Sequence, residues 1–104
     1  MFFINFIYKL DNTSSYIKGD AMVEYRFDVQ LLIEGENLDE DVINDYITDN
    51  IEGDCLLVVG DDELIKIHFH TNTPWILLEY GYSLGDIHDI VVENMIRQAA
   101  GLQG

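Results

Sequence analysis

The sequence predicts an α+β protein with the ferredoxin-like βαββαβ fold, in which two helices cover one face of a four-stranded antiparallel sheet. The first observation is that the apolar period changes along the chain, in the order strand, helix, strand, strand, helix, strand. The second is size, because 104 residues, 48% of them hydrophobic, suffice for one domain with its own core. Right-handed crossovers favour this topology and make the first and third strands antiparallel neighbours at the sheet centre.

The first strand and the first helix follow from periodicity. Residues 25–33 alternate, with Tyr25, Phe27, Val29, Leu31 and Ile33 on one face and Arg26, Asp28 and Gln30 on the other. Residues 36–53 then place apolar side chains on one helical stripe, namely Val42, Ile43, Tyr46, Ile47 and Ile51. Acidic residues at 39–41 suit the positive end of the helix dipole, and Gly53 is the expected stop.

Two further strands form a hairpin. The segment "CLLVV", residues 55–59, predicts a buried strand, and "GDD" predicts the turn after it. Cys55, the single cysteine, is expected to be a small buried thiol rather than a nucleophile. The third strand, residues 63–71, turns one set of side chains towards the helices, namely Ile65, Ile67 and Phe69. Its open face carries Leu64, Lys66, His68 and His70.

The second helix begins at Pro74, with Thr73 or Asn72 as its cap, and ends near Gly85. It is apolar nearly all round, which predicts that a second copy or a companion domain covers its outer side. The alternative is that the N-terminal segment "MFFINFIYKL" folds over it. A last strand spans residues 86–95, with His88 expected at the surface.

The predicted organisation has three parts. Residues 1–20 are expected to form an extra strand or a short helix followed by a loop, residues 21–95 the ferredoxin-like domain, and residues 96–104 a tail or the start of a linker. The apolar start is too short to span a bilayer and lacks the basic region of a signal peptide, so no membrane insertion is expected. One cysteine gives no disulfide framework, which favours the cytoplasm.

Composition argues against two classes of partner. Five Lys and Arg residues stand against 20 Asp and Glu residues, and the formal net charge is −15. Such a chain would be repelled by a phosphate backbone, so nucleic-acid binding is not expected. The same repulsion opposes docking on anionic lipid.

The candidate site is a cluster on the open face of the sheet. His68 and His70 lie two positions apart on one strand, roughly 7 Å apart at Cα, and Asp28 is expected on the neighbouring strand. Zinc and other first-row metals accept these ligands. Lys66 and Arg26 on the same face would steady an anion. The alternative is a polar face whose histidines hydrogen-bond to each other, to Asp28 or to water.

The sequence also resembles a known family. Residues 24–98, and above all "KIHFHTN" at residues 66–72, resemble the middle domain of the bacterial fatty acid kinase ATP-binding subunit, of the dihydroxyacetone-kinase-like family. The matching positions include Val58 to Asp62, Leu78 to Tyr80 and Glu93 to Met95. The departure is Asp28, which stands where the family has a cysteine associated with the histidine pair, so a cysteine-dependent role is not carried over. Nothing in the chain resembles that family's nucleotide-binding domain.

The resemblance implies a non-catalytic accessory domain from a system that phosphorylates fatty acids carried by a DegV-like binding protein. Its expected partners are that carrier and either a second copy or a companion kinase domain. Two other functions are compatible with the residues. One is phosphoryl or acyl-phosphate chemistry assisted by a metal at Asp28, His68 and His70. The other is a small-molecule sensor that binds its ligand at the sheet or a dimer interface.

Overall fold

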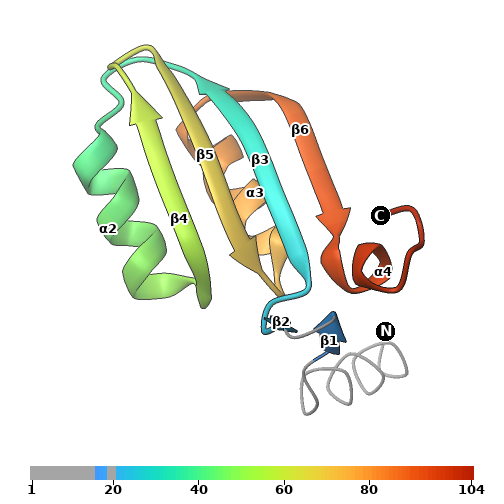
Figure 1. The fold of residues 1–104 in the computed structure, drawn as a ribbon. Coiled ribbons are helices and arrows are strands. Elements are labelled where there is room, and N and C mark those ends of the chain that lie inside the picture. Colours follow the sequence, from blue (N-terminus) through green and yellow to red (C-terminus); the bar gives the residue numbers. More distant parts are fainter. Residues whose placement is uncertain (1–15, 19–20) are drawn as a thin grey trace, which may run out of the picture.

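The computed structural model describes residues 16–18 and 21–104 (Figure 1). In chain order its elements are β1 (Tyr16–Lys18), β2 (Ala21–Val23), β3 (Phe27–Glu34), α2 (Glu40–Asn50), β4 (Gly53–Gly60), β5 (Leu64–Thr71), α3 (Pro74–Leu84), β6 (Asp86–Asn94) and α4 (Met95–Ala99). The predicted order of strands and helices is therefore confirmed from β3 to β6. The first and last elements are additions, and the segment "MFFINFIYKL" lies outside the described residues.

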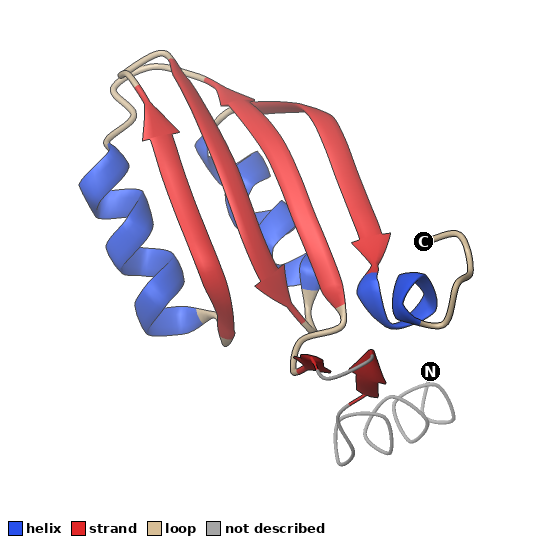
Figure 2. Cartoon of the chain, viewed as in Figure 1, coloured by secondary structure: helices blue, strands red, loops and turns tan. Residues whose placement is uncertain are grey.

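The main sheet has the strand order β4-β5-β3-β6, and every neighbouring pair is antiparallel. The expected pairing of the first and third strands at the centre is confirmed, because β3 and β5 pair along their whole length from Phe27 opposite Thr71 to Glu34 opposite Leu64. Figure 2 shows both long helices on the same side of this sheet. This is the ferredoxin-like arrangement.

The core lies between the sheet and helices α2 and α3. Alternate residues of the two central strands are almost fully buried there, namely Val29, Leu31, Ile33, Ile65, Ile67 and Phe69. Ile43 and Ile47 reach them from α2, and Leu77 from α3. The two helices also touch each other, because the rings of Tyr46 and Tyr80 stack with their centroids 3.9 Å apart. In the described part of the chain, neither long helix covers the other face of the sheet, which is therefore its open face.

Both long helices begin where the sequence indicates, but only one has a side-chain cap. The carboxylate Oδ1 of Asp39 accepts hydrogen bonds from the backbone N–H groups of Asp41 and Val42, at 2.9 and 3.2 Å. Thr73 occupies the cap position of α3 without such a bond. The side chain of Asn72 instead accepts a hydrogen bond of 2.7 Å from the backbone N–H of Arg26, so it ties the end of β5 to the start of β3.

Each edge strand carries a bulge that the sequence did not predict. Pairing of β4 with β5 shifts register between Asp54 and Leu57, and pairing of β6 with β3 shifts opposite Leu31. A residue with positive φ lies at each shift, Cys55 at 54° and Asp89 at 51°. A bulge places two residues opposite one, so it changes which side chains face the open side of the sheet.

The prediction of a fully buried second strand is wrong. In β4 only Val58 is buried, whereas Leu57 and Val59 on the open side are 50% and 41% exposed. Cys55 is exposed rather than buried. The reason is position, because β4 is an edge strand and both long helices lie on the other side of the sheet. A continuous apolar run in the sequence does not distinguish an edge strand from a central one.

The C-terminal residues form structure where a tail or linker was expected. Met95–Ala99 make α4, whose N-cap residue Asn94 accepts a hydrogen bond of 3.0 Å from the N–H of Arg97. The side chain of Arg97 then donates to the carbonyl of Gln103 at 2.9 Å, which folds the last residues back onto the helix. No helix in the described part of the chain combines the length and the apolar run needed to cross a bilayer.

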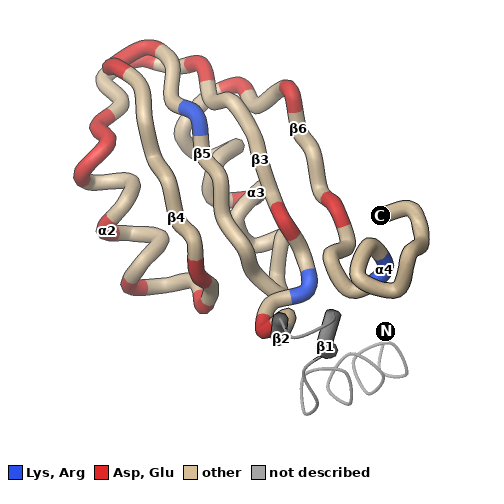
Figure 3. The backbone as a smooth tube through the Cα atoms, in the orientation of Figure 1, with Lys and Arg blue, Asp and Glu red and all other residues tan. Residues whose placement is uncertain are grey.

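Acidic residues gather at one end of the sheet and along α2 (Figure 3). They include the turn between β4 and β5, where Asp61 accepts hydrogen bonds of 2.9 Å from the N–H groups of Glu63 and Leu64. These bonds lower the pKa of the Asp61 carboxyl. The basic residues of β5 and α4, Lys66 and Arg97, lie far apart in the fold and form no shared patch.

Candidate functional site

The open face of the sheet carries one row of ionisable residues that crosses all four strands. Register pairs His70 on β5 with Asp54 on one side and with Asp28 on the other, and pairs Asp28 with Glu93 on β6. His68 lies two residues before His70 on the same face, opposite Gln30 and Leu57. The predicted convergence of Asp28, His68 and His70 is therefore present.

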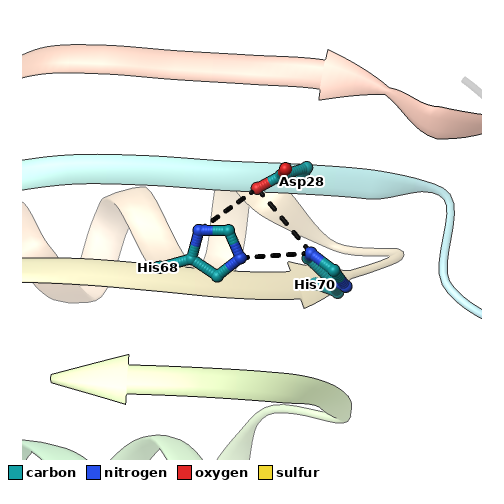
Figure 4. A group of neighbouring side chains, drawn as sticks. All are labelled: Asp28, His68 and His70. Atoms are coloured by element: carbon teal, nitrogen blue, oxygen red, sulfur yellow. Dashed lines mark hydrogen bonds and ion pairs between the residues drawn. The ribbon is translucent and has the colours of Figure 1, made fainter. Parts of the chain in front are cut away.

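These three side chains point towards one another (Figure 4). Asp28 Oδ1 lies 3.5 Å from Nδ1 of His68 and 3.8 Å from Nε2 of His70. The Nε2 atoms of the two histidines are 3.1 Å apart, so one imidazole donates a hydrogen bond to the other. Each side chain is 22–28% exposed, which leaves the cluster partly shielded but open to ions from solvent.

The cluster has the composition and spacing of a divalent-cation site. One ligand atom from each residue lies within 4.8 Å of the others. Two ligands of a tetrahedral zinc ion, each about 2.1 Å from the metal, are roughly 3.4 Å apart. Asp28 Oδ1 is buried and accepts no hydrogen bond from any described residue, although a buried carboxylate oxygen normally has a partner. A cation between the three side chains would supply that partner, so these residues fit zinc or a similar metal.

The two basic residues assigned to the candidate cluster are not part of it. Lys66 is exposed and lines a separate cavity of about 250 Å³ together with Gln30, Asp89 and Val91. Arg26 lies in the bend before β3 rather than on the strand. Its backbone carbonyl accepts a hydrogen bond of 2.8 Å from the N–H of Met95. Neither side chain therefore occupies the position predicted for steadying an anion beside the histidines.

His88 lies on the same face of the sheet, near the opposite end from His70. Its Nε2 atom is 2.7 Å from Glu34 Oε1, and its Nδ1 atom is 3.3 Å from Asp89 Oδ1. The Asp89 carboxylate raises the pKa of His88, and Glu34 adds to the effect. His88 thus belongs to a local ion-pair group and not to the candidate metal cluster.

Sequence reasoning missed Asp54 and Cys55 as neighbours of His70. The Nδ1 atom of His70 lies 3.4 Å from Asp54 Oδ1, on the ring edge opposite Asp28. Asp54, Cys55 and His70 also offer three ligand atoms within 4.8 Å of one another. Partial desolvation raises the pKa of the Cys55 thiol, and the Asp54 carboxylate raises it further, so the thiol is protonated near neutral pH.

The fold and this cluster coincide with a known protein family. Residues 24–102 match the family described as the middle domain of FakA-like fatty acid kinase proteins. The chain belongs to this family. The match takes in all four strands of the main sheet, both long helices, α4 and every residue of the histidine cluster, so the resemblance inferred from residues 24–98 is confirmed.

Individual relatives match a shorter part of the chain. An uncharacterised protein of Staphylococcus haemolyticus is 48% identical over 46 residues, which are 44% of this chain and 8% of that protein. Uncharacterised proteins of Staphylococcus epidermidis and Staphylococcus aureus are 46% and 44% identical over the same length and shares. The matched segment is thus a small part of each relative. Their names record no activity.

Proposed function

We propose that this chain is a non-catalytic accessory domain of a fatty acid kinase, and that it positions partner proteins around a divalent cation held by Asp28, His68 and His70. The observation that carries the proposal is the family match over residues 24–102, which includes the histidine cluster. The substrate of the whole system would be a fatty acid carried by a separate DegV-like binding protein. The proposed location of this system is the cytoplasm.

The described residues support a non-catalytic role. Nucleotide-binding folds cradle phosphates with a glycine-rich loop that leads into a helix N-terminus. In the described part of the chain, α2 follows Asp39 and α3 follows Thr73, and neither connection is rich in glycine. Another domain would therefore bind ATP, while this domain holds the components in place.

The proposed cation would act first on structure. A divalent ion at Asp28, His68 and His70 cross-links β3 and β5 on their open face, and its charge offsets part of the acidic row that continues to Asp54 and Glu93. Binding to the folded chain only would raise stability as the ion concentration rises. A site fixed in this way presents the surrounding surface to a partner in one conformation.

Two apolar surfaces support a role in assembly. On the outer side of α3, Ile76 is 43% exposed and Tyr82 is 72% exposed. On the open face of the sheet, Leu57 and Val59 flank the histidine cluster from β4. Apolar side chains gathered in this way mark interaction sites in many proteins. We assign the α3 surface to a second copy or the companion kinase domain, and the open face to the DegV-like carrier.

The proposal is tested by separating binding from catalysis. The chain is mixed with a DegV-like carrier loaded with fatty acid, association is measured by titration calorimetry, and acyl-phosphate formation is followed with ATP present. We expect saturable association and no acyl phosphate until a nucleotide-binding domain of the same family is added. Product formed by the chain and carrier alone would overturn the non-catalytic role. Absence of association would overturn the partner assignment.

A second candidate function is metal-assisted phosphoryl or acyl-phosphate chemistry at the same cluster. It is favoured by the open coordination that three protein ligands leave on zinc, which is the pattern of catalytic rather than structural sites. In this case the isolated chain with zinc would hydrolyse an acyl phosphate offered in solution. His68→Ala would abolish that hydrolysis, whereas His88→Ala, outside the cluster, would leave it unchanged.

A further inference from the structure

We propose that Asp54, Cys55 and the Nδ1 atom of His70 form a second cation site, specific for thiophilic ions, which competes with the first site for His70. The three ligand atoms lie within 4.8 Å of one another, and Asp54 Oδ1 is 3.4 Å from His70 Nδ1. The set combines a thiol, a carboxylate and an imidazole. Thiolate ligands favour zinc and softer ions over magnesium and calcium.

The bulge in β4 creates this set. Because Cys55 and Leu56 together stand opposite Phe69, Asp54 keeps its pairing with His70 while Leu57 pairs with His68. Cys55 has a positive φ of 54° at the shift and is exposed instead of packed beneath the sheet. On binding a divalent ion, the thiol would lose its proton to solvent as the bond between sulfur and metal forms.

The site has an entry path and space for further ligands. Asp54, Cys55 and His70 line a cavity of about 300 Å³, whose wall is completed by residues such as Glu24, Tyr25 and Met95. Three protein ligands leave at least one position of a tetrahedral ion free. The cavity is large enough for water or a small anion to occupy that position.

His70 links the two sites and makes them exclusive. Its Nε2 atom faces Asp28 and His68, while its Nδ1 atom faces Asp54. A neutral imidazole has one nitrogen that carries a proton and one that can donate electrons to a metal. An ion at Nδ1 therefore places the proton on Nε2 and removes it from the first site. This exclusion, unlike the second site itself, rests on the cation proposed at Asp28, His68 and His70.

Cadmium titration of the 104-residue chain tests the second site. Cd²⁺ bound to a thiolate gives a charge-transfer absorption in the ultraviolet, and Cys55 is the single cysteine that can produce it. We expect the band to saturate in the wild-type chain and to be absent in Cys55→Ser. His70→Ala should weaken Cd²⁺ binding at least as much as loss of an outer-shell partner does, about 10- to 100-fold. Bound Cd²⁺ should also protect Cys55 from alkylation by iodoacetamide.

The matched control is His68→Ala, which disrupts the first site and leaves the second intact. It should keep the full cadmium band, and Asp28→Asn serves as a second such variant if His68→Ala does not fold. Loss of the band in both folded variants, or no band in the wild-type chain, would overturn the second site. Native mass spectrometry with two ions bound to one chain would overturn the exclusion. A band in both variants with no zinc bound to Cys55→Ser would support the second site while rejecting the first.

Discussion

Asp28 and His70 stand directly opposite each other in the pairing of β3 with β5, with Asp28 Oδ1 3.8 Å from His70 Nε2. Backbone register alone therefore brings the carboxylate to the imidazole. Cross-strand partners of this kind face the same side of a sheet, and their Cβ atoms are about 5 Å apart. The side chain at position 28 is thus free to change chemically while it remains within reach of both histidines.

Exchange of this side chain should tune zinc affinity. Asp28→Ala removes one of three ligands, so we expect zinc affinity to fall by at least about tenfold. Asp28→Cys should retain binding because a thiolate is also a zinc ligand. Titration calorimetry with zinc measures both variants, and Asp86→Ala, an exposed acid on β6, is the control. Equal affinity of Asp28→Ala and the wild-type chain would place the ion elsewhere.

The ion pairs of His88 should make stability depend on pH. Asp89 and Glu34 raise the pKa of His88, so the folded state favours its protonated form. The resulting stabilisation is fully present below the unfolded pKa of about 6.5 and is lost as pH rises through the raised folded value. Urea midpoints of the wild-type chain and His88→Gln should therefore differ more at about pH 5.5 than at about pH 8.5. A difference that does not change with pH would contradict this prediction.

Gly53 should be essential at the start of β4. A Cβ atom at this position would collide with the backbone carbonyl oxygen of His70 and with the Phe69 ring. Backbone cannot yield as a flexible side chain does, so Gly53→Ala should cost about 3 kcal/mol or more. Thermal or urea unfolding measures the loss, and Asp49→Ala on the exposed side of α2 should stay within about 0.5 kcal/mol. A mild effect of Gly53→Ala would mean that β4 moves away from β5 easily.

The outer side of α3 should govern self-association. If a second copy covers this surface, a charge at Tyr82 would be buried in the interface and would oppose dimer formation. Sedimentation velocity at micromolar concentration should then show a dimer for the wild-type chain and a monomer for Tyr82→Glu. Ser83→Glu carries the same charge at an exposed polar position one residue away and should remain dimeric. A monomeric wild-type chain would assign the surface to a companion domain or to the N-terminal segment.

Much of the fold could be predicted from local sequence. Alternation in β3 and β5 indicates which side chains face the helices, and the 3.6-residue period marks Ile43 and Ile47 as buried. Asp39 is recognisable as the cap of α2, and its two hydrogen bonds are present. The grouping of Asp28 with His68 and His70 also follows, because strand topology and a period of two fix both the neighbour and the face.

Tertiary structure alone decided what surrounds His70. Pairing register depends on residues far apart in the chain, and a bulge is a property of the pair rather than of either strand. The shift in β4 therefore sets Asp54 and Cys55 beside His70, although the local pattern "CLLVV" predicts burial. In the same way, Asn72 bonds to the N–H of Arg26 rather than capping α3, because folding places that donor within 2.7 Å. The sequence by itself determined the family, the order of elements and the first set of ligands, since each rests on local period or motif. Long-range pairing decided the second set, because only contact between strands defines it.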